Sequence, residues 1–366
     1  MEYVQELVTT LHDFGGASPD APLAETTVVV PLTERDHGSP AAERVFRILS
    51  SLDLDSVLVA LHADRTAVTE VTEWLGGFDP TPEVLWCTAP PVEQLLAQHG
   101  LGGGAGKGRD VWLALGIAAA RSSYVVVHDA DATSYGPSHV PKLCAPLANG
   151  HDFVKGYYAR VEDGRLYGRL FRLFFTPLVR ELAQSHDAPI LRYLSAFRYA
   201  LAGEFAATAS LARQLRVQRD WGLEVGTLGD AFAGAGFERS AQVDLGVHEH
   251  DHRAVSGEQG LGSMADQVGR ALFRVVEDAG VDPDYGSLPA RYRAAARRLV
   301  EQYAADAAFN GLDYDAAGER EQVRTYADAV RPPEADTRLP AWSETDLDPV
   351  AVGDAARDAL GTCPER

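Results

Sequence analysis

The sequence predicts an α/β fold in which helices cover both faces of a mainly parallel sheet, followed by a helical C-terminal region. Three observations support this prediction. From Thr26 onward, short runs rich in β-branched residues alternate with amphipathic helical stretches. The strand runs are almost continuously apolar, as expected for a sheet buried on both faces. From Gly260 to Tyr326 the pattern is helical.

The first half of the chain contains four predicted strands and four predicted helices. We expect strands at 26–32, 56–62, 84–87 and 124–128. We expect helices at 41–49, 66–75, 92–99 and 110–120, the last of them after the glycine-rich segment 102–108. This alternation is typical of a doubly wound sheet.

The second half is less regular. We expect strands at 152–158 and 239–245, helices at 167–183 and 221–235, and a helical region at 260–326 with breaks near Pro283 and Asn310. The chain then divides into an N-terminal helical segment (1–25), a first sheet half (26–150), a second sheet half (151–255) and C-terminal helices (256–330). The last segment (331–366) is an acidic tail whose Pro, Asp and Glu content is typical of a flexible region.

Composition excludes several classes of protein. The formal net charge is -20, from 53 acidic and 33 basic residues, and such a surface repels nucleic acids and anionic lipids. There is no run of 18 apolar residues, so we expect no membrane span. No basic segment precedes an apolar core at the N-terminus, and the three cysteines cannot build a disulfide framework. We therefore expect a cytoplasmic protein. The Asp-rich, Lys-poor composition favours a halophilic protein, with an acidic mesophilic protein from a GC-rich genome as the alternative.

The sharpest candidates for chemistry are Asp129 and Asp131, at the end of the predicted strand 124–128. Open α/β sheets bind ligands beyond the carboxyl ends of their strands. Two carboxylates one residue apart can hold a hard divalent cation there, such as Mg²⁺ or Mn²⁺. The cation would neutralise a diphosphate leaving group. The alternative is a pair of ordinary loop residues in an acidic chain.

Lys107 lies in the glycine-rich segment, between Gly106 and Gly108. The segment is not a P-loop, because Leu101 stands where that motif needs glycine and Gly108 stands where it needs Ser or Thr. We expect Lys107 to reach a phosphate at the N-terminus of the following helix, where backbone N–H groups favour anions. A flexible surface loop is the alternative.

Three histidines, His248, His250 and His252, follow the predicted strand 239–245. Strand alternation would place all three on one face as a zinc site, whereas so polar a run is also typical of a solvated loop. We favour a third interpretation, by analogy: His250 completes the coordination begun by Asp129 and Asp131.

Two further regions contain candidate site residues. Leu201 precedes Gly203, which would let the backbone approach a ligand closely. Glu224 lies near the start of a predicted helix, where it either faces a bound sugar or serves as a favourable helix-start carboxylate. Arg169 and Arg172 share a helical face. They either hold an anionic acceptor or pair with surface acids.

Taken in order, these motifs resemble those of the retaining GT-A glycosyltransferases that make glucosyl- or mannosyl-3-phosphoglycerate, precursors of compatible solutes. The resemblance runs from about Val28 to Arg253. Its motifs are Val-Pro-Leu at 30–32, Gly-Lys-Gly at 106–108, Asp-Ala-Asp at 129–131, Phe-Val-Lys-Gly-Tyr-Tyr at 153–158, Gly-Arg at 168–169, Leu-Ala-Gly-Glu-Phe-Ala at 201–206, Trp-Gly-Leu-Glu at 221–224 and Asp-Leu-Gly-Val-His-Glu-His at 244–250.

The resemblance implies a GT-A fold in which 26–150 binds a nucleotide sugar and 151–255 binds the acceptor. The residues that it assigns to the nucleotide are Pro31, Leu32, Glu34 and Ala63, with Lys107 on the diphosphate. The residues that it assigns to the metal are Asp131 and His250, with Asp129 close to the ribose or the metal. Around the donor sugar it places Leu201, Trp221 and Glu224, and at the acceptor phosphate Gly168 and Arg169. The implied mechanism is front-face attack, with Glu224 orienting the sugar.

Phe171 departs from the pattern, because the resemblance implies a hydroxyl-bearing residue there. A phosphate hydrogen bond is then missing, which Arg172 or Arg198 would have to replace. The acceptor therefore stays open between 3-phosphoglycerate, another small anion and a lipid-linked molecule. The donor stays open between the UDP-glucose and GDP-mannose types. A nucleotide-sugar-binding protein without turnover and a nucleotidyltransferase are the competing classes, and the helices after 260 offer faces for a homodimer.

Overall fold

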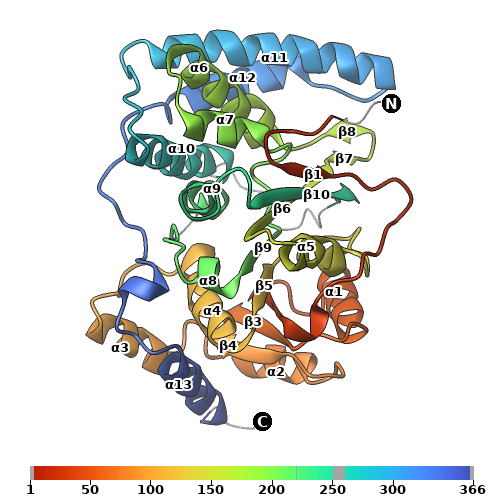
Figure 1. Cartoon of the computed structure of the whole chain (residues 1–366), viewed down its shortest axis with the longest axis vertical. Coiled ribbons are helices and arrows are strands. Elements are labelled where there is room, and N and C mark those ends of the chain that lie inside the picture. Colours follow the sequence, from red (N-terminus) through yellow and green to blue (C-terminus); the bar gives the residue numbers. More distant parts are fainter. Residues whose placement is uncertain (1–3, 220, 250–259, 363–366) are drawn as a thin grey trace.

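The computed structural model describes residues 4–219, 221–249 and 260–362 and confirms the predicted α/β architecture. One eight-stranded sheet has the order β1-β10-β6-β9-β5-β2-β3-β4. Helices lie on both sides of this sheet, and α6, α10, α11 and α12 gather at one end of the molecule (Figure 1).

The strands of the main sheet are β1 (Thr9–Leu11), β2 (Thr26–Thr33), β3 (Ser56–His62), β4 (Glu83–Trp86), β5 (Tyr124–Val127), β6 (Phe153–Ala159), β9 (Phe205–Thr208) and β10 (Ser240–Val247). A separate small hairpin is formed by β7 (Val161–Glu162) and β8 (Arg165–Leu166). The helices of the first half are α1 (Pro40–Ser50), α2 (Val68–Leu75), α3 (Pro90–Gln98), α4 (Lys107–Arg121) and α5 (His139–Ala148). Those that follow are α6 (Thr176–Ser185), α7 (Pro189–Ala196), α8 (Ala209–Ala212), α9 (Leu223–Gly234), α10 (Gly260–Asp278), α11 (Leu288–Asn310), α12 (Ala316–Ala327) and α13 (Pro349–Gly361).

The sheet is parallel except at one strand. β9 runs antiparallel to both β5 and β6 and so joins the two halves of the sheet. Every other neighbouring pair is parallel. Val28, Val29 and Val30 in β2 are fully buried, because the sheet is covered on both faces. The sequence pattern did not reveal β9 or α5.

The predicted N-terminal helical segment is wrong for the residues described. This region forms the edge strand β1 and a single 3-10 turn at Leu23–Glu25. Thr9 pairs with Ala241 and Thr10 with Gln242 on β10, and the Gln5 side chain bonds both backbone polar groups of Thr10. Threonine favours extended backbone, and the edge of β10 offers that extended segment its hydrogen-bond partners.

The predicted flexible tail is also wrong for residues 331–362. A 3-10 turn at Trp342–Glu344 precedes α13, which packs against α3 and α4. The Trp342 ring stacks on Trp112 at 4.3 Å between centroids, and each indole N–H donates to a backbone carbonyl, of Trp112 and of Pro340 respectively. Buried aromatic surface therefore holds a segment whose charge content alone favours disorder.

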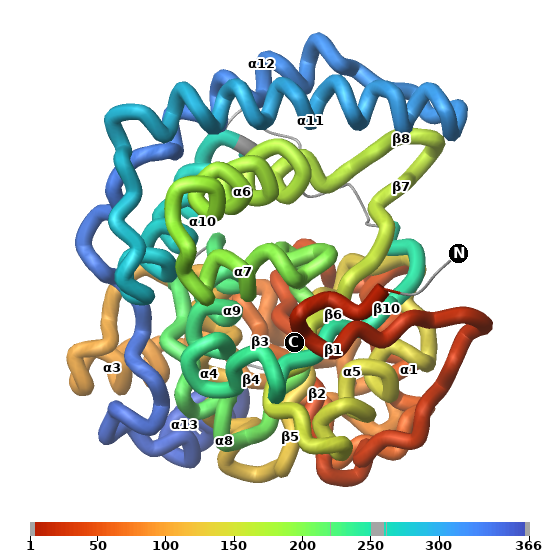
Figure 2. The backbone as a smooth tube through the Cα atoms, turned by 45° about the horizontal axis from the view of Figure 1, so that its top comes forward, coloured from red at the N-terminus to blue at the C-terminus, as the bar shows by residue number. Residues whose placement is uncertain are grey.

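The C-terminal helices confirm the sequence prediction, since α10, α11 and α12 are separated near Pro283 and Asn310 as expected. In Figure 2 they lie across the end of the molecule opposite α13. None of the helices within the described part of the chain is long and apolar enough to cross a membrane.

Candidate active site

A cleft opens at the carboxyl ends of β2, β3 and β5, the edge at which open α/β sheets bind ligands. Its volume is about 590 Å³, which is in the range of pockets that hold small molecules and cofactors. Eight of the residues predicted to bind the nucleotide sugar or metal line it: Pro31, Leu32, Glu34, Ala63, Lys107, Asp129, Asp131 and Trp221.

The Asp129 carboxylate and the Lys107 ammonium form an ion pair in this cleft. The two groups meet with Nζ 2.7 Å from Oδ1 and 2.8 Å from Oδ2. Lys107 is the first residue of α4, so the pair lies at a helix N-terminus, where free N–H groups favour anions. Burial disfavours the charged lysine, but the charges of Asp129 and Glu224 outweigh it and raise the pKa of Lys107. The lysine therefore stays charged.

Asp131 is the group best suited to a cation. Its Oδ1 atom is buried and has no hydrogen-bond partner in the described part of the chain. Burial and the neighbouring charge of Asp129 raise the pKa of the Asp131 carboxyl to about 7. A buried, unpartnered carboxylate oxygen is unfavourable by itself, and a hard divalent cation would satisfy it. The residues present thus fit Mg²⁺ or Mn²⁺.

A glycine turn brings Trp221 and Glu224 to the same place. Gly222 has φ 111°, and a Cβ there would lie 2.8 Å from the Ala271 side chain, so only glycine suits this turn. α9 begins directly after it. The Glu224 Oε1 atom lies 3.8 Å from the Lys107 Nζ atom, which lies 6.0 Å from the Trp221 ring centre. Lys107 therefore lies between two carboxylates, that of Asp129 after β5 and that of Glu224 in α9.

Gly203, predicted to let the backbone approach a ligand closely, lies close to the Asp129 side chain. A Cβ at this position would lie 2.6 Å from the Asp129 Oδ2 atom. Leu201 packs against the core and is not among the described residues that line the cleft. Two buried charged residues behind the site were missed from the sequence. Burial lowers the pKa of Lys155 to about 8 and raises that of Glu204.

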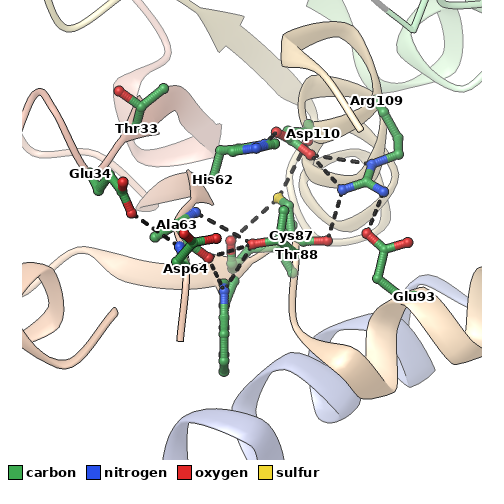
Figure 3. Close-up of polar contacts among 12 residues, drawn as sticks. Thr33, Glu34, His62, Ala63, Asp64, Cys87, Thr88, Glu93, Arg109 and Asp110 are labelled. Carbon is green, nitrogen blue, oxygen red and sulfur yellow. Dashed lines mark hydrogen bonds and ion pairs between the residues drawn. The ribbon is translucent and has the colours of Figure 1, made fainter. Parts of the chain in front are cut away.

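The other end of the cleft is held by hydrogen bonds that join the loop after β3 to the loop after β2 and to the end of β4 (Figure 3). Glu34 Oε2 accepts from the backbone N–H of Asp64 at 3.1 Å. The Ala63 carbonyl accepts from the Trp86 indole at 2.9 Å and from the Thr88 hydroxyl at 2.7 Å. These bonds fix the backbone around the predicted nucleotide contacts Glu34 and Ala63.

His62 and Asp110 also line the cleft, and sequence reasoning missed both. The His62 Nδ1 atom lies 2.8 Å from the Asp110 Oδ2 atom. Their positions in the sequence could have indicated both residues. His62 ends a predicted strand, much as Asp129 follows another, and Asp110 lies one helical turn beyond Lys107 on the same helix.

The residues predicted for the acceptor are not among the described residues that line this cleft. Gly168 has φ 74°, and a Cβ there would lie 3.2 Å from the Tyr199 hydroxyl. The Arg169 side chain is half-exposed, with its Nε atom 3.9 Å from the Glu319 Oε1 atom. Its guanidinium is therefore accessible to a ligand.

Arg172 is different, because its guanidinium is bound inside the protein. It donates to both carboxylate oxygens of Glu319, at 3.2 and 2.6 Å, and to the Tyr167 carbonyl at 2.9 Å. Its charge also lies over the Tyr303 ring, 4.5 Å from the centre. This argues against the predicted acceptor contact, since a phosphate would have to displace Glu319.

His250, the predicted third metal ligand, lies outside the described residues, as does His252. His248 is buried and stacks on Tyr158 at 4.0 Å between centroids, and burial lowers its pKa to about 3. Within residues 4–219, 221–249 and 260–362, no group of three or more His, Cys, Asp or Glu side chains is arranged to hold a metal ion. The Asp129 and Asp131 pair is therefore the candidate metal centre.

A mainly parallel sheet, an Asp-x-Asp pair at a central strand end and a nucleotide-sized cleft beside it define a glycosyltransferase of the GT-A class. The chain matches no protein-family profile. It is 33% identical to glucosyl-3-phosphoglycerate synthase from Methanococcoides burtonii, over 94% of this chain and 93% of that one. It is 31% identical to the synthase from Persephonella marina, over 89% and 87%. The chain belongs to the glucosyl-3-phosphoglycerate synthase family.

Solved structures agree with this assignment. Mannosyl-3-phosphoglycerate synthase from Rubrobacter xylanophilus superposes with a TM-score of 0.55 at 26% identity, over 71% of this chain and 76% of that one. Glucosyl-3-phosphoglycerate synthase from Mycobacterium tuberculosis, in complex with Mg²⁺ and UDP, gives a TM-score of 0.56 at 25% identity, over 76% and 89%. The sequence prediction of a GT-A fold in this family is confirmed.

Proposed function

We propose that the protein transfers glucose from UDP-glucose to 3-phosphoglycerate in the presence of Mg²⁺ or Mn²⁺. The full-length relatives bear the name of this activity, and the Mycobacterium tuberculosis enzyme has been solved with Mn²⁺, UDP-glucose and phosphoglyceric acid. The single observation on this chain that carries the proposal is that Lys107, which lines the cleft, pairs with Asp129 and lies 3.8 Å from Glu224.

The reaction has a simple balance of bonds. The bond between the anomeric carbon of glucose and the β-phosphate oxygen breaks. A hydroxyl oxygen of 3-phosphoglycerate bonds to that carbon on the same face, and its proton passes to the departing UDP. A metal held by Asp129 and Asp131 supplies charge neutralisation for the leaving diphosphate.

The protein residues bind and orient the donor. Lys107 is a fixed positive charge for the diphosphate, and its ion pair with Asp129 keeps it directed into the cleft. Glu224 is buried and close to Lys107, so its carboxylate can accept hydrogen bonds from sugar hydroxyls. Trp221 is exposed at the cleft and offers a flat apolar surface to the sugar.

For the acceptor, we propose Arg169 and the backbone at Gly168, and no longer Arg172. Arg169 is the one of the two arginines whose guanidinium is accessible. Bidentate binding of phosphate or carboxylate suits this group. The acceptor is then recognised by fewer polar contacts than the sequence motif implies.

Two broader expectations stay as proposals. A cytoplasmic location is supported by Cys87 and Cys144, which are buried and not joined in a disulfide. A homodimer through the C-terminal helices is supported by Phe309, which is almost fully exposed near the end of α11. The molar mass from light scattering tests the dimer, with twice 39.4 kDa expected.

The test of function is a screen of donors against acceptors with the purified protein in high KCl. We expect release of UDP from UDP-glucose that requires both Mg²⁺ and 3-phosphoglycerate and stops when EDTA is added. The control is Asp346→Asn, a surface change that leaves the cleft intact. Activity with GDP-mannose and none with UDP-glucose would identify a different donor. Activity with another small anion and none with 3-phosphoglycerate would identify a different acceptor. A folded protein that binds UDP but turns over no donor would refute the proposal.

A further inference from the structure

The contact between His62 and Asp110 has defined geometry within the donor cleft (Figure 3). The His62 side chain is 41% exposed, whereas the Asp110 side chain is 2% exposed. The Nδ1 and Oδ2 atoms lie 2.8 Å apart. A carboxylate has no proton to give, so Nδ1 must carry the hydrogen and donate it. The Nε2 atom is then the one available to a ligand, and it makes no hydrogen bond to the residues described.

Asp110 is itself held by a chain of ionic contacts. The Arg109 NH2 group donates to Asp110 Oδ1 at 3.3 Å and to the Cys87 carbonyl at 3.2 Å. On its other side, Arg109 NH1 donates to Glu93 at 2.5 Å. The ring of His62 is therefore oriented by Asp110, which is itself held by Arg109, a residue that is not among those lining the cleft.

The charges around His62 favour the imidazolium form. Glu93 and Asp110 carry one negative charge each and Arg109 one positive, so a protonated His62 makes the group neutral. The charged residues that act on His62 are Asp110 and Arg109 from α4 and Asp64 from its own loop, with the hydrogen bond to Asp110 raising its pKa most. Imidazolium Nε2 donates a hydrogen bond and cannot accept one.

His62 lies where the base of a bound nucleotide would be. Asp129 follows β5 and pairs with Lys107, the residue proposed for the diphosphate, and β2 separates β5 from β3. By the pairing register, His62 lies four residues beyond the level at which β5 ends, so it is about 10 Å to the side of β5 and about 13 Å further along the strands. Lys107 and His62 line the same cleft, so a nucleotide whose diphosphate lies at Lys107 can extend its base across β2 toward His62.

We propose that His62, oriented by Asp110, donates a hydrogen bond from Nε2 to the 4-oxo group of a pyrimidine base of the donor. The site then selects nucleotides whose base presents an oxo group, such as uracil, over those that present an amino group in that position, such as cytosine. This deepens the proposed function, because it rests on a nucleoside diphosphate occupying the cleft. It names His62 as the residue that sets base specificity and Asp110 as its positioning residue.

UDP and CDP provide the test, because they share the diphosphate, the ribose and the O2 carbonyl and differ in the 4-oxo or 4-amino edge. Their affinities for the full-length protein are measured by titration calorimetry with Mg²⁺ at pH 6, where His62 is protonated. We expect the wild-type protein to prefer UDP by about tenfold, the usual size of one hydrogen bond to a charged group.

Two variants of His62 separate recognition from loss of structure. His62→Ala should lower the UDP affinity by about tenfold and leave CDP binding nearly unchanged, so that the preference collapses. His62→Gln should keep affinity for both nucleotides without preference, since an amide offers both a donor and an acceptor. The matched control is His99→Ala, because His99 also bonds an aspartate, Asp346 at 2.9 Å, and is not among the residues that line the cleft. It should keep the wild-type ratio.

A UDP preference that survives in His62→Ala, or that is absent from the wild type, overturns the proposal. These outcomes are distinct from failure of the proposed function, which is read from turnover. Turnover with 3-phosphoglycerate together with an unchanged ratio in His62→Ala would reject only the role of His62. A ratio that depends on His62 without turnover would support its role and reject the activity.

Discussion

Replacing Arg172 distinguishes a structural arginine from an acceptor-binding one. Arg172 and Arg169 lie three residues apart and both approach Glu319, but their side chains are 9% and 46% exposed. Arg172→Met would leave the Glu319 carboxylate buried without its main cation. Breaking a buried ion pair in this way costs about 3–5 kcal/mol of unfolding free energy. Arg169→Met removes a half-exposed contact at 3.9 Å, and its cost is about 0–1 kcal/mol.

The assay compares urea unfolding, followed by tryptophan fluorescence, with the KM for 3-phosphoglycerate. We expect Arg172→Met to lower the unfolding free energy strongly with little change in KM for the folded fraction. We expect Arg169→Met to raise KM by about tenfold, the loss of one charge-assisted contact, at nearly unchanged stability.

A double variant checks the physical cause. Arg172→Met combined with Glu319→Leu removes both charges, and a pair of apolar side chains in their place restores much of the stability. The reasoning fails if Arg172→Met unfolds at the wild-type urea concentration and instead raises KM. Arg172 would then bind the acceptor, as the sequence pattern suggested.

Three further predictions test other parts of the structure. Gly116→Ala places a Cβ 2.1 Å from the Trp342 ring, so urea unfolding should show a loss of about 1–3 kcal/mol through overpacking. Gly203→Ala places a Cβ 2.6 Å from the Asp129 carboxylate; a Mg²⁺ titration of turnover should show weaker activation at nearly unchanged melting temperature. Burial lowers the pKa of His139 to about 3, against about 6.5 when unfolded. Below pH 6.5 the unfolded chain therefore binds a proton that the folded one does not, and stability falls as the pH drops. His139→Leu should remove about 2 kcal/mol of the loss between pH 7 and pH 5.

Each of these three predictions has a control or a result that would contradict it. Gly262→Ala, at a helical position where the nearest atom lies 3.6 Å from the new Cβ, should be neutral or slightly stabilising. If Gly116→Ala proved as stable as Gly262→Ala, the close packing of Gly116 against Trp342 would be contradicted. Unchanged Mg²⁺ activation in Gly203→Ala would show that Asp129 does not need its present position. An equal pH slope in wild type and His139→Leu would mean that other groups dominate acid unfolding.

Much of the donor site could be predicted because it depends on residue type at strand ends. Asp129 and Asp131 follow an apolar strand, and Lys107 opens a helix. In a parallel sheet the carboxyl ends of neighbouring strands lie at the same edge. Local pattern and this one rule of topology predicted Asp129, Asp131 and Lys107. The family resemblance supplied the other five residues of the prediction that line the same cleft, Pro31, Leu32, Glu34, Ala63 and Trp221.

The failures have a common origin in contacts between distant segments. The threonines of β1 gave no sign of which sheet edge would accept them, and the acidic C-terminal segment gave no sign that Trp342 would stack on Trp112. Composition describes the solvation of an isolated segment. Whether that segment folds depends on the surface that the rest of the chain offers it.

The sequence by itself determined the α/β class, the order of strands and helices from β2 to β5 and the chemical types available to a nucleotide-sugar site. Tertiary structure alone decided which charges are paired. Arg172 and Arg169 share one helical pattern, yet of the two only Arg172 is buried and donates to both carboxylate oxygens of Glu319 on α12. His62 and Asp110 lie 48 residues apart, yet they meet at 2.8 Å. Hydrophobic periodicity in the sequence indicates which residues face inward. A buried charge also needs a partner, and elements remote in the chain supply it.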